Sequence, residues 1–127
     1  MVNDIQNKII IVGGGLIGEL LHLMLKSKGF EINHFTKDSS VKNRTFALSP
    51  SSVDWLRSLG LPSIFFESLS EIKSMKIFDS SIKNSVTLNA DDLQRSALAY
   101  MANEKDFDEA IKNTFSIKKN LKKLSTD

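Results

Sequence analysis

The chain has 127 residues, 41% of them apolar and 25% charged, which is the composition of a single globular domain. A formal net charge of +2 gives no strong case for a nucleic-acid partner, and the absence of cysteine excludes disulfides, thiolate metal sites and cysteine nucleophiles. No apolar run reaches the ~20 residues of a membrane span, and the short apolar start lacks a basic leader and a cleavage site, so we expect a cytoplasmic protein.

The first predicted element is an apolar, β-branched run over residues 8–12, typical of a central parallel strand covered on both faces. Three glycines follow it, and a largely apolar stretch then predicts a helix over 16–28 that Gly29 ends. Residues 30–35 alternate well enough to form a second strand. These elements together predict a βαβ unit within about thirty residues.

The predicted first helix carries a polar stripe on a wide apolar surface. Glu19, His22 and Lys26 fall three and four residues apart, so they share one face, while apolar residues cover the rest. So wide an apolar surface predicts a largely buried helix. The two histidines of the chain, His22 and His34, are too few and too poorly partnered to indicate a metal site or a general base.

Two further helices and a strand are predicted downstream. Ser49 and the proline after it form a helix start, so we expect a helix over 50–59. Residues 71–79 are predicted as a strand of an antiparallel sheet. Asn89 is predicted to cap a helix over 90–102, with two aspartates in its first turn where they suit the helix dipole.

The end of the chain differs in composition from the rest. We divide the sequence into a domain over 1–103 and a lysine-rich tail over 104–127. Ile117, Leu121 and Leu124 are helically spaced, and lysines occupy the other face, which favours a solvated amphipathic helix or a frayed end over a binding patch. The lysines of that face are Lys118, Lys119, Lys122 and Lys123.

The glycines after the first strand have the spacing of the dinucleotide-binding fingerprint. Gly13 would make the tight turn, Gly15 would let a pyrophosphate approach the backbone, and Gly18 would let the helix pack closely on the strand. The helix N-terminus would supply free amide donors and a positive dipole end. The strand–turn–helix context makes the pattern informative. The predicted phosphate-binding residues are Gly13, Gly14, Gly15, Leu16, Ile17 and Gly18.

The same fingerprint requires an acidic residue at the end of the second strand, to bind the ribose hydroxyls. This position holds Thr36, followed by Lys37, while Asp38 comes two residues late. Thr36 can give one neutral hydrogen bond, and Lys37 could attract a phosphate. The sequence therefore predicts weakened binding of an adenosine ribose.

Residues 43–61 carry a more specific pattern. The stretch "NRTFALSPSSVDWLRSLGL" resembles the segment after the second strand in the flavin-dependent aromatic hydroxylases of ubiquinone biosynthesis, the 2-polyprenylphenol hydroxylase type. "IKSMKIFD" and "VTLNADDLQRSALAYM" look like later segments of that family, so the ordered similarity spans residues 8 to about 101. The residues that match the motif are Arg44, Ala47, Leu48, Ser49 and Ser52.

This resemblance implies a Rossmann-like α/β fold with a parallel sheet, incomplete relative to the family, plus a strand of the antiparallel sheet. It implies that the glycine turn holds the FAD pyrophosphate, that Arg44 lies beside the flavin and that Gln94 contacts the chain of the cofactor. It also implies reduction by NAD(P)H and hydroxylation of a polyprenylated phenol near the inner face of a membrane. Asp91 and Asp92 stand where the family often has a basic residue, and would repel a pyrophosphate. No residue is assigned as a catalytic acid, base or metal ligand.

The later "ADG" and "GD" segments of the family are absent from this chain. The sequence therefore predicts one wall of a flavin site, inactive alone, with exposed sheet edges and an uncovered core face. A second chain that completes the fold, or self-association, would cover them. Two alternatives stay open: a small nucleotide-binding module without catalysis, and a scaffold that keeps the βαβ frame without any ligand.

Overall fold

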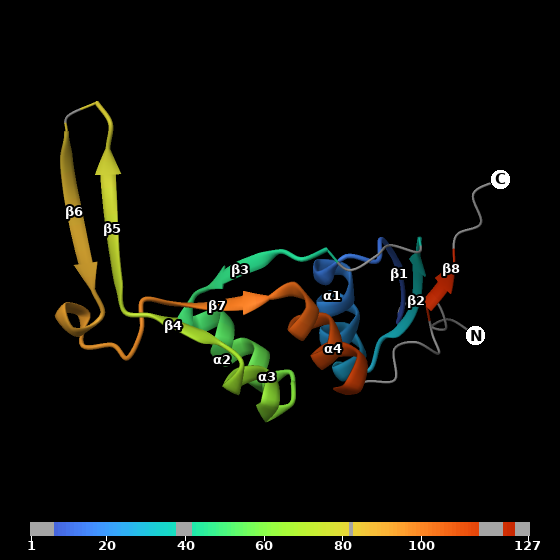
Figure 1. The fold of residues 1–127 in the computed structure, drawn as a ribbon. Coiled ribbons are helices and arrows are strands. Elements are labelled where there is room, and N and C mark those ends of the chain that lie inside the picture. Colours follow the sequence, from blue (N-terminus) through green and yellow to red (C-terminus); the bar gives the residue numbers. More distant parts are fainter. Residues whose placement is uncertain (1–6, 38–41, 82, 115–120, 124–127) are drawn as a thin grey trace, which may run out of the picture.

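The computed structural model describes residues 7–37, 42–81, 83–114 and 121–123 (Figure 1). Its elements along the chain are β1 (Lys8–Val12), α1 (Leu16–Ser27), β2 (Glu31–Thr36), β3 (Thr45–Leu48), α2 (Pro50–Ser58), α3 (Ser63–Glu67), β4 (Ser70–Ile72), β5 (Ser74–Asp79), β6 (Asn84–Asn89), the 3-10 helix η1 (Asp91–Leu93), β7 (Ala99–Asn103), α4 (Glu104–Thr114) and β8 (Leu121–Lys123). The α/β class, with one parallel sheet and further antiparallel pairing, agrees with the sequence prediction.

The predicted βαβ unit is confirmed. β1 and β2 pair in parallel, with Lys8 opposite Glu31 and Val12 opposite Phe35. α1 joins the two strands and packs on both of them and on α4. Gly29 follows α1 with a φ of +85°, a left-handed conformation that suits a glycine at a helix end.

The parallel sheet has a third strand that sequence reasoning missed. β8 pairs in parallel with β2, with Leu121 opposite His34 and Lys123 opposite Thr36. The predicted helix around Leu121 is therefore wrong at residues 121–123, because pairing with β2 decides the local structure. The other positions of that pattern, at 117–119 and 124, lie outside the described residues.

The second sheet is antiparallel, in the order β3-β7-β4. The predicted helix over 90–102 is wrong, because only η1 is helical there and β7 takes the central place in this sheet. Gln94, directly after η1, has a φ of +52°, which ends the helical run. The alanine-rich β7 illustrates how tertiary pairing overrides local helix propensity.

The predicted helix over 50–59 is confirmed as α2. The Ser49 hydroxyl accepts a hydrogen bond from the Ser52 N–H at 3.1 Å, and Pro50 occupies the first helical position. α1, α2, α3, α4 and β7 share one apolar core, and the following side chains form it: Leu20, Leu23, Leu56, Leu61, Phe65, Ala102, Phe107, Ala110 and Ile111.

The predicted strand over 71–79 is interrupted at Lys73 and forms two strands. β4 joins the antiparallel sheet, whereas β5 pairs with β6 in a hairpin that projects away from the other elements (Figure 1). Ile77 and Val86 are opposite each other on one face of this hairpin, and 55% and 58% of their areas are exposed.

β1 is an edge strand of its sheet within the described residues, so the expectation of a central strand is wrong, and the exposure of Ile10 and Val12 shows that one of its faces is not covered. Ile10 and Val12 point to one face of the sheet, and 68% and 71% of their areas are exposed. The sequence predicted an uncovered apolar face without locating it, and β1 carries exposed apolar residues of this kind. Among the helices of the described part, none has the length and apolar character needed to cross a membrane.

Candidate functional site

The glycine turn connects the carboxyl end of β1 to α1. The Gly13 N–H donates to the Phe35 carbonyl at 2.8 Å, which ties the turn to the end of β2. Gly13 has a φ of +125°, a conformation that side-chain-bearing residues rarely adopt. The turn therefore has a fixed start and depends on glycine at its first position.

The N-terminus of α1 presents unpaired amides to the turn. Gly15 is the N-cap residue, and the first intrahelical bond runs from the Glu19 N–H to the Gly15 carbonyl at 3.1 Å. The N–H groups of Leu16, Ile17 and Gly18 come before that bond, so none of them has an intrahelical partner. Three amides at the positive end of a helix are a suitable arrangement for an anion.

The other three glycines differ in the space that surrounds them. A Cβ on Gly15 would meet no atom within 4 Å, so the space before this residue is open. A Cβ on Gly18 would lie 2.5 Å from the Gly13 carbonyl oxygen, so the close approach of helix and turn needs glycine there. A Cβ on Gly14 would lie 1.6 Å from the Thr36 Oγ1 and 2.8 Å from the Thr36 Cβ. Of these three positions, Gly15 alone leaves room for a ligand; a Cβ on Gly13 would likewise meet no atom within 4 Å.

Thr36 ends β2 directly beside the turn, where the sequence placed it. Its hydroxyl donates to the Lys37 carbonyl at 3.1 Å. The side chain packs against Gly14, so it fills space in the turn and brings no charge to it. Asp38, the late carboxylate of the sequence analysis, lies outside the described residues.

Two members of the polar stripe of α1, Glu19 and His22, are buried, whereas Lys26 is exposed, and His22 has a partner. The His22 Nδ1 lies 3.2 Å from the His34 Nδ1, and the His34 Nε2 lies 2.6 Å from the Gly13 carbonyl oxygen. The two rings are 1% and 0% exposed. Burial, followed by His34 and Lys26, lowers the pKa of His22. The expectation that these histidines are poorly partnered is therefore wrong.

The sequence carried only a weak signal for this histidine pair. His22 lies one helical turn after Gly18, and His34 is two residues before the end of β2, so both positions face the interface between helix and sheet. Within the described residues, no group of three or more histidine or acidic side chains is arranged to hold a metal ion.

Glu19 is also buried on the inward face of α1, against α4. Burial, followed by repulsion from Asp108, raises the pKa of Glu19 to about 7, although Lys112 opposes this shift. Lys112 and Asp108 form an ion pair one turn apart on α4. Glu19 is thus a carboxyl group that changes charge near neutral pH beside the first turn of α1.

Arg44 is held by α4. Its Nε and Nη2 atoms donate to the two carboxylate oxygens of Glu104 at 3.0 and 2.6 Å, and the Glu104 N–H donates to the Arg44 carbonyl at 2.8 Å. The hydrogen bond from Arg44 lowers the pKa of the Glu104 carboxyl. A fork of this kind fixes the guanidinium. Contact between Arg44 and a flavin stays a prediction.

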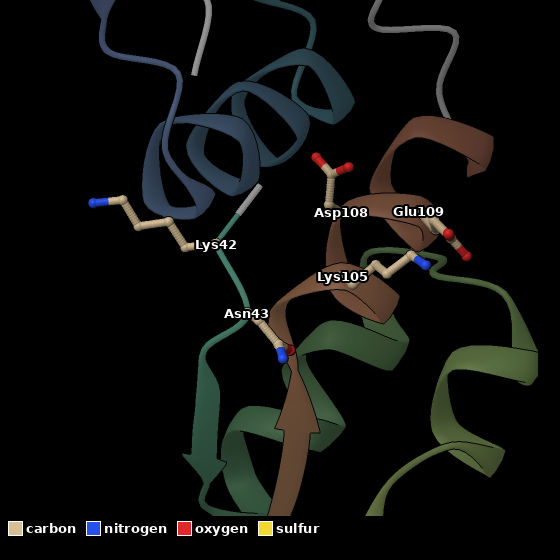
Figure 2. A pocket seen from close by; sticks show the side chains of 5 residues that line it. All are labelled: Lys42, Asn43, Lys105, Asp108 and Glu109. Atoms are coloured by element: carbon tan, nitrogen blue, oxygen red, sulfur yellow. The ribbon is translucent and has the colours of Figure 1, made fainter. Parts of the chain in front are cut away.

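A cavity of about 410 Å³ lies between α4 and the segment before β3. Its lining combines two cations and two acids, and Figure 2 shows the Asp108 carboxylate pointing toward α1 while Lys42 extends away from α4. Asp108 lines this cavity, and the same residue contributes to raising the pKa of the buried Glu19. The residues that line it are Lys42, Asn43, Lys105, Asp108 and Glu109.

Gln94 is not brought to this site. It follows η1 in the segment between β6 and β7, which Figure 1 shows at the opposite end of the molecule from α1. Asp91 and Asp92 belong to the same segment, and the Asp92 carboxylate accepts from the Asn89 amide at 3.1 Å. These aspartates therefore lie away from the glycine turn (Figure 1), and their effect on a bound pyrophosphate stays a prediction.

No protein-family model and no curated protein matches the chain. Solved structures do match its fold. HpxO from Klebsiella pneumoniae, solved with FAD and uric acid, is similar at a TM-score of 0.67 and 14% identity over 95% of this chain and 31% of that protein. The p-nitrophenol 4-monooxygenase PnpA from Pseudomonas putida gives 0.66 and 18% over 94% of this chain and 32% of its own length.

A third similar structure is the 2,6-dihydroxypyridine-3-hydroxylase from Arthrobacter nicotinovorans, with a TM-score of 0.60 and 15% identity over 95% of this chain and 31% of that enzyme. This chain therefore spans about a third of the length of the proteins that it matches. At such identities the comparison shows the fold alone, and that fold is shared with FAD-dependent monooxygenases.

Proposed function

We propose that this chain binds FAD through the glycine turn and forms the FAD-binding portion of a flavin-dependent monooxygenase. One observation carries the proposal: the open space before Gly15 faces a helix N-terminus whose first three amides have no intrahelical partner. A pyrophosphate entering this space would meet donors and a positive dipole end without displacing any side chain.

The residues present suit the phosphate end of the cofactor better than its ribose end. Gly13 to Gly18 would hold the pyrophosphate, whereas the cavity beside α4 combines the cations Lys42 and Lys105 with two acids. The Thr36 hydroxyl already donates to the Lys37 carbonyl, so it would accept one hydrogen bond from a ribose hydroxyl. This neutral hydrogen bond would replace the stronger one that a carboxylate accepts. Arg44, oriented by Glu104, would lie beside the flavin.

Bound FAD would supply the hydride and oxygen chemistry, with NAD(P)H as the reductant. The motif at residues 43–61 supports a polyprenylated phenol as the substrate and ubiquinone biosynthesis as the pathway, so the work would be done at a membrane surface. The chain itself would bind and orient the cofactor. The exposed Ile10 and Val12 support the further proposal that a second chain, or a second copy, completes the site.

FAD titration of the purified chain, followed by quenching of flavin fluorescence, tests the proposal. We expect saturable binding that Gly15→Val abolishes, because the new side chain would fill the open space at a φ of −81° that valine accepts. Ser85→Val adds a valine to the exposed β6 strand and serves as the matched control. Competition by ADP as strong as by FAD would favour the small binding module. A folded chain that binds no FAD would overturn the proposal and favour the scaffold.

A further inference from the structure

The strongest unexplained feature is the row of polar atoms beneath the glycine turn. His22 on α1 contacts His34 on β2, and His34 contacts the Gly13 carbonyl, at nitrogen–nitrogen and nitrogen–oxygen distances of 3.2 and 2.6 Å. Both rings are shielded from solvent, and the row ends at Gly13, which is exposed. A buried polar row that ends on a backbone carbonyl constrains that carbonyl.

The acceptor at the end of the row fixes the protons along it. A carbonyl oxygen only accepts, so the His34 Nε2 must carry a hydrogen. In the neutral ring the His34 Nδ1 is then an acceptor, and the His22 Nδ1–H donates to it. The pair thus has one tautomer for each ring: the Gly13 carbonyl determines the tautomer of His34, and His34 determines the tautomer of His22.

The direction of the Gly13 carbonyl determines where the next amide points. The peptide bonds of the described residues are trans, so the Gly14 N–H is directed opposite to the Gly13 carbonyl. His34 draws that carbonyl toward the interior, and the Gly14 N–H therefore faces the other way, away from the sheet interior. Glycine tolerates many peptide orientations, so this one needs an external restraint.

Gly18 makes the restraint possible. A Cβ there would lie 2.5 Å from the Gly13 oxygen and 3.4 Å from the His34 Nε2, so the missing side chain leaves room for the hydrogen bond. The same position that lets the helix pack closely on the strand thus also admits the histidine.

Few charges face the pair from the elements packed around it. On α1, Lys26 lies one turn after His22 and contributes to lowering its pKa, while Glu19 lies one turn before it against Asp108 and Lys112 of α4. Lys8 of β1 and Glu31 of β2 are paired at the opposite end of the sheet, 3.9 Å apart. If one of the two rings gains a proton, an N–H of one ring can still donate to the Nδ1 of the other. If both rings were charged, the two Nδ1–H groups would face each other and the hydrogen bond would be lost.

We propose that the buried His22–His34 pair is a positioning device that holds the Gly13–Gly14 peptide with the Gly14 N–H directed at the phosphate site. The peptide geometry stands on the contacts alone, whereas its consequence for FAD rests on the proposed function.

Two variants of His34 separate a positioning role from simple packing. His34→Gln keeps an N–H donor for the Gly13 carbonyl, and His34→Leu keeps bulk without a donor. We expect FAD affinity within about twofold of the parent for the glutamine variant and about tenfold weaker for the leucine variant.

Nuclear magnetic resonance provides a readout that needs no ligand. The chain has only 2 histidines, so single variants assign both rings. We expect the Nε2–H tautomer for His34, the Nδ1–H tautomer for His22, and a Gly14 amide shift that changes in His34→Leu but not in His34→Gln. Thermal unfolding of each variant shows that the compared chains are folded.

An Nδ1–H tautomer of His34, or equal FAD affinities for the parent and both variants, would overturn the proposal. If the parent binds no FAD, the proposed function fails by itself, and the Gly14 amide shift then decides whether the pair positions the peptide. Should His34→Leu not fold, the ring tautomers of the parent carry the same decision.

Discussion

The two ends of the molecule are built in opposite ways. At the glycine turn, close contacts limit substitution at two positions: Gly18 lies against the Gly13 carbonyl and His34, and Gly14 lies against Thr36. At the far end, the β5–β6 hairpin projects from the other elements and exposes apolar side chains on strands that, among the described residues, pair only with each other (Figure 1).

This difference separates a region whose contacts lie within one βαβ unit from regions that leave apolar side chains exposed. Under the proposed function, the turn would need no other part of the chain to hold a phosphate, because its donors and its open space come from the same βαβ unit. The hairpin and the bare face of β1 have the properties of surfaces that another part would cover. Substitutions at the turn should therefore change folding, while substitutions at the hairpin should change association.

The largest effect is expected at Gly18. Gly18→Val should destabilise the fold by about 3 kcal/mol or more, because the new Cβ would overlap the Gly13 carbonyl and disturb His34. Gly15→Val, three residues earlier, should change stability by less than about 1 kcal/mol, since its Cβ meets open space. Urea unfolding of the two variants measures the difference. Equal losses would show that the turn is not as constrained as the structure indicates.

The next effect concerns pH and Glu19. Its folded-state pKa of about 7 lies above the ordinary 4.5, so the folded chain binds the extra proton, and stability falls as pH rises through that window. Glu19→Gln should therefore be more stable than the parent by about 2–3 kcal/mol above neutral pH. Below the ordinary carboxyl range, the two should unfold alike. Urea unfolding across this pH range checks the prediction, and a difference that is independent of pH would contradict it.

A smaller effect is expected from the contact between Gly14 and Thr36. Gly14→Ala should destabilise by about 2 kcal/mol, because the added Cβ collides with both the Oγ1 and the Cβ of Thr36. Thr36→Gly should remove that collision, so the double variant should lose less than the sum of the two single losses. A double-mutant cycle by urea unfolding gives the coupling free energy. Additive losses would mean that the turn moves away from Thr36.

The parts of this fold that the sequence predicted are those that local signals specify. Gly29 ends α1 and Ser49 starts α2, and each acts through its own backbone and near neighbours. β7 and β8 escaped prediction because their partners lie far away in the chain: Ala99 pairs with Ile72, and Leu121 pairs with His34. The apolar residues in these segments do have helical spacing, but this spacing carries no information about the distant strands with which they pair.

The candidate site divides in the same way. Gly13, Gly15 and Gly18 were assigned from spacing, and the structure gives each a separate geometric reason. The link between His22 and His34 could not be read from spacing, because it exists only once α1 lies on β2. Gln94 was assigned to the cofactor site from a motif in a predicted helix. Because that segment forms η1 and β7 instead of a helix, Gln94 lies away from the glycine turn (Figure 1).

The smallest effect on stability is expected at the β5–β6 hairpin, where substitutions should change association but not the free energy of unfolding. Ile77→Thr combined with Val86→Thr keeps β-branched residues in both strands and removes apolar area from an exposed face, so the free energy of unfolding should change by less than about 0.5 kcal/mol. If this face is covered by a second copy of the chain, sedimentation velocity should show less association for the double variant than for the parent. Val12→Thr applies the same test to the bare face of the parallel sheet, so the two variants distinguish which surface a second copy would use. A parent that stays monomeric at high concentration would contradict self-association and leave a separate completing chain as the partner to seek.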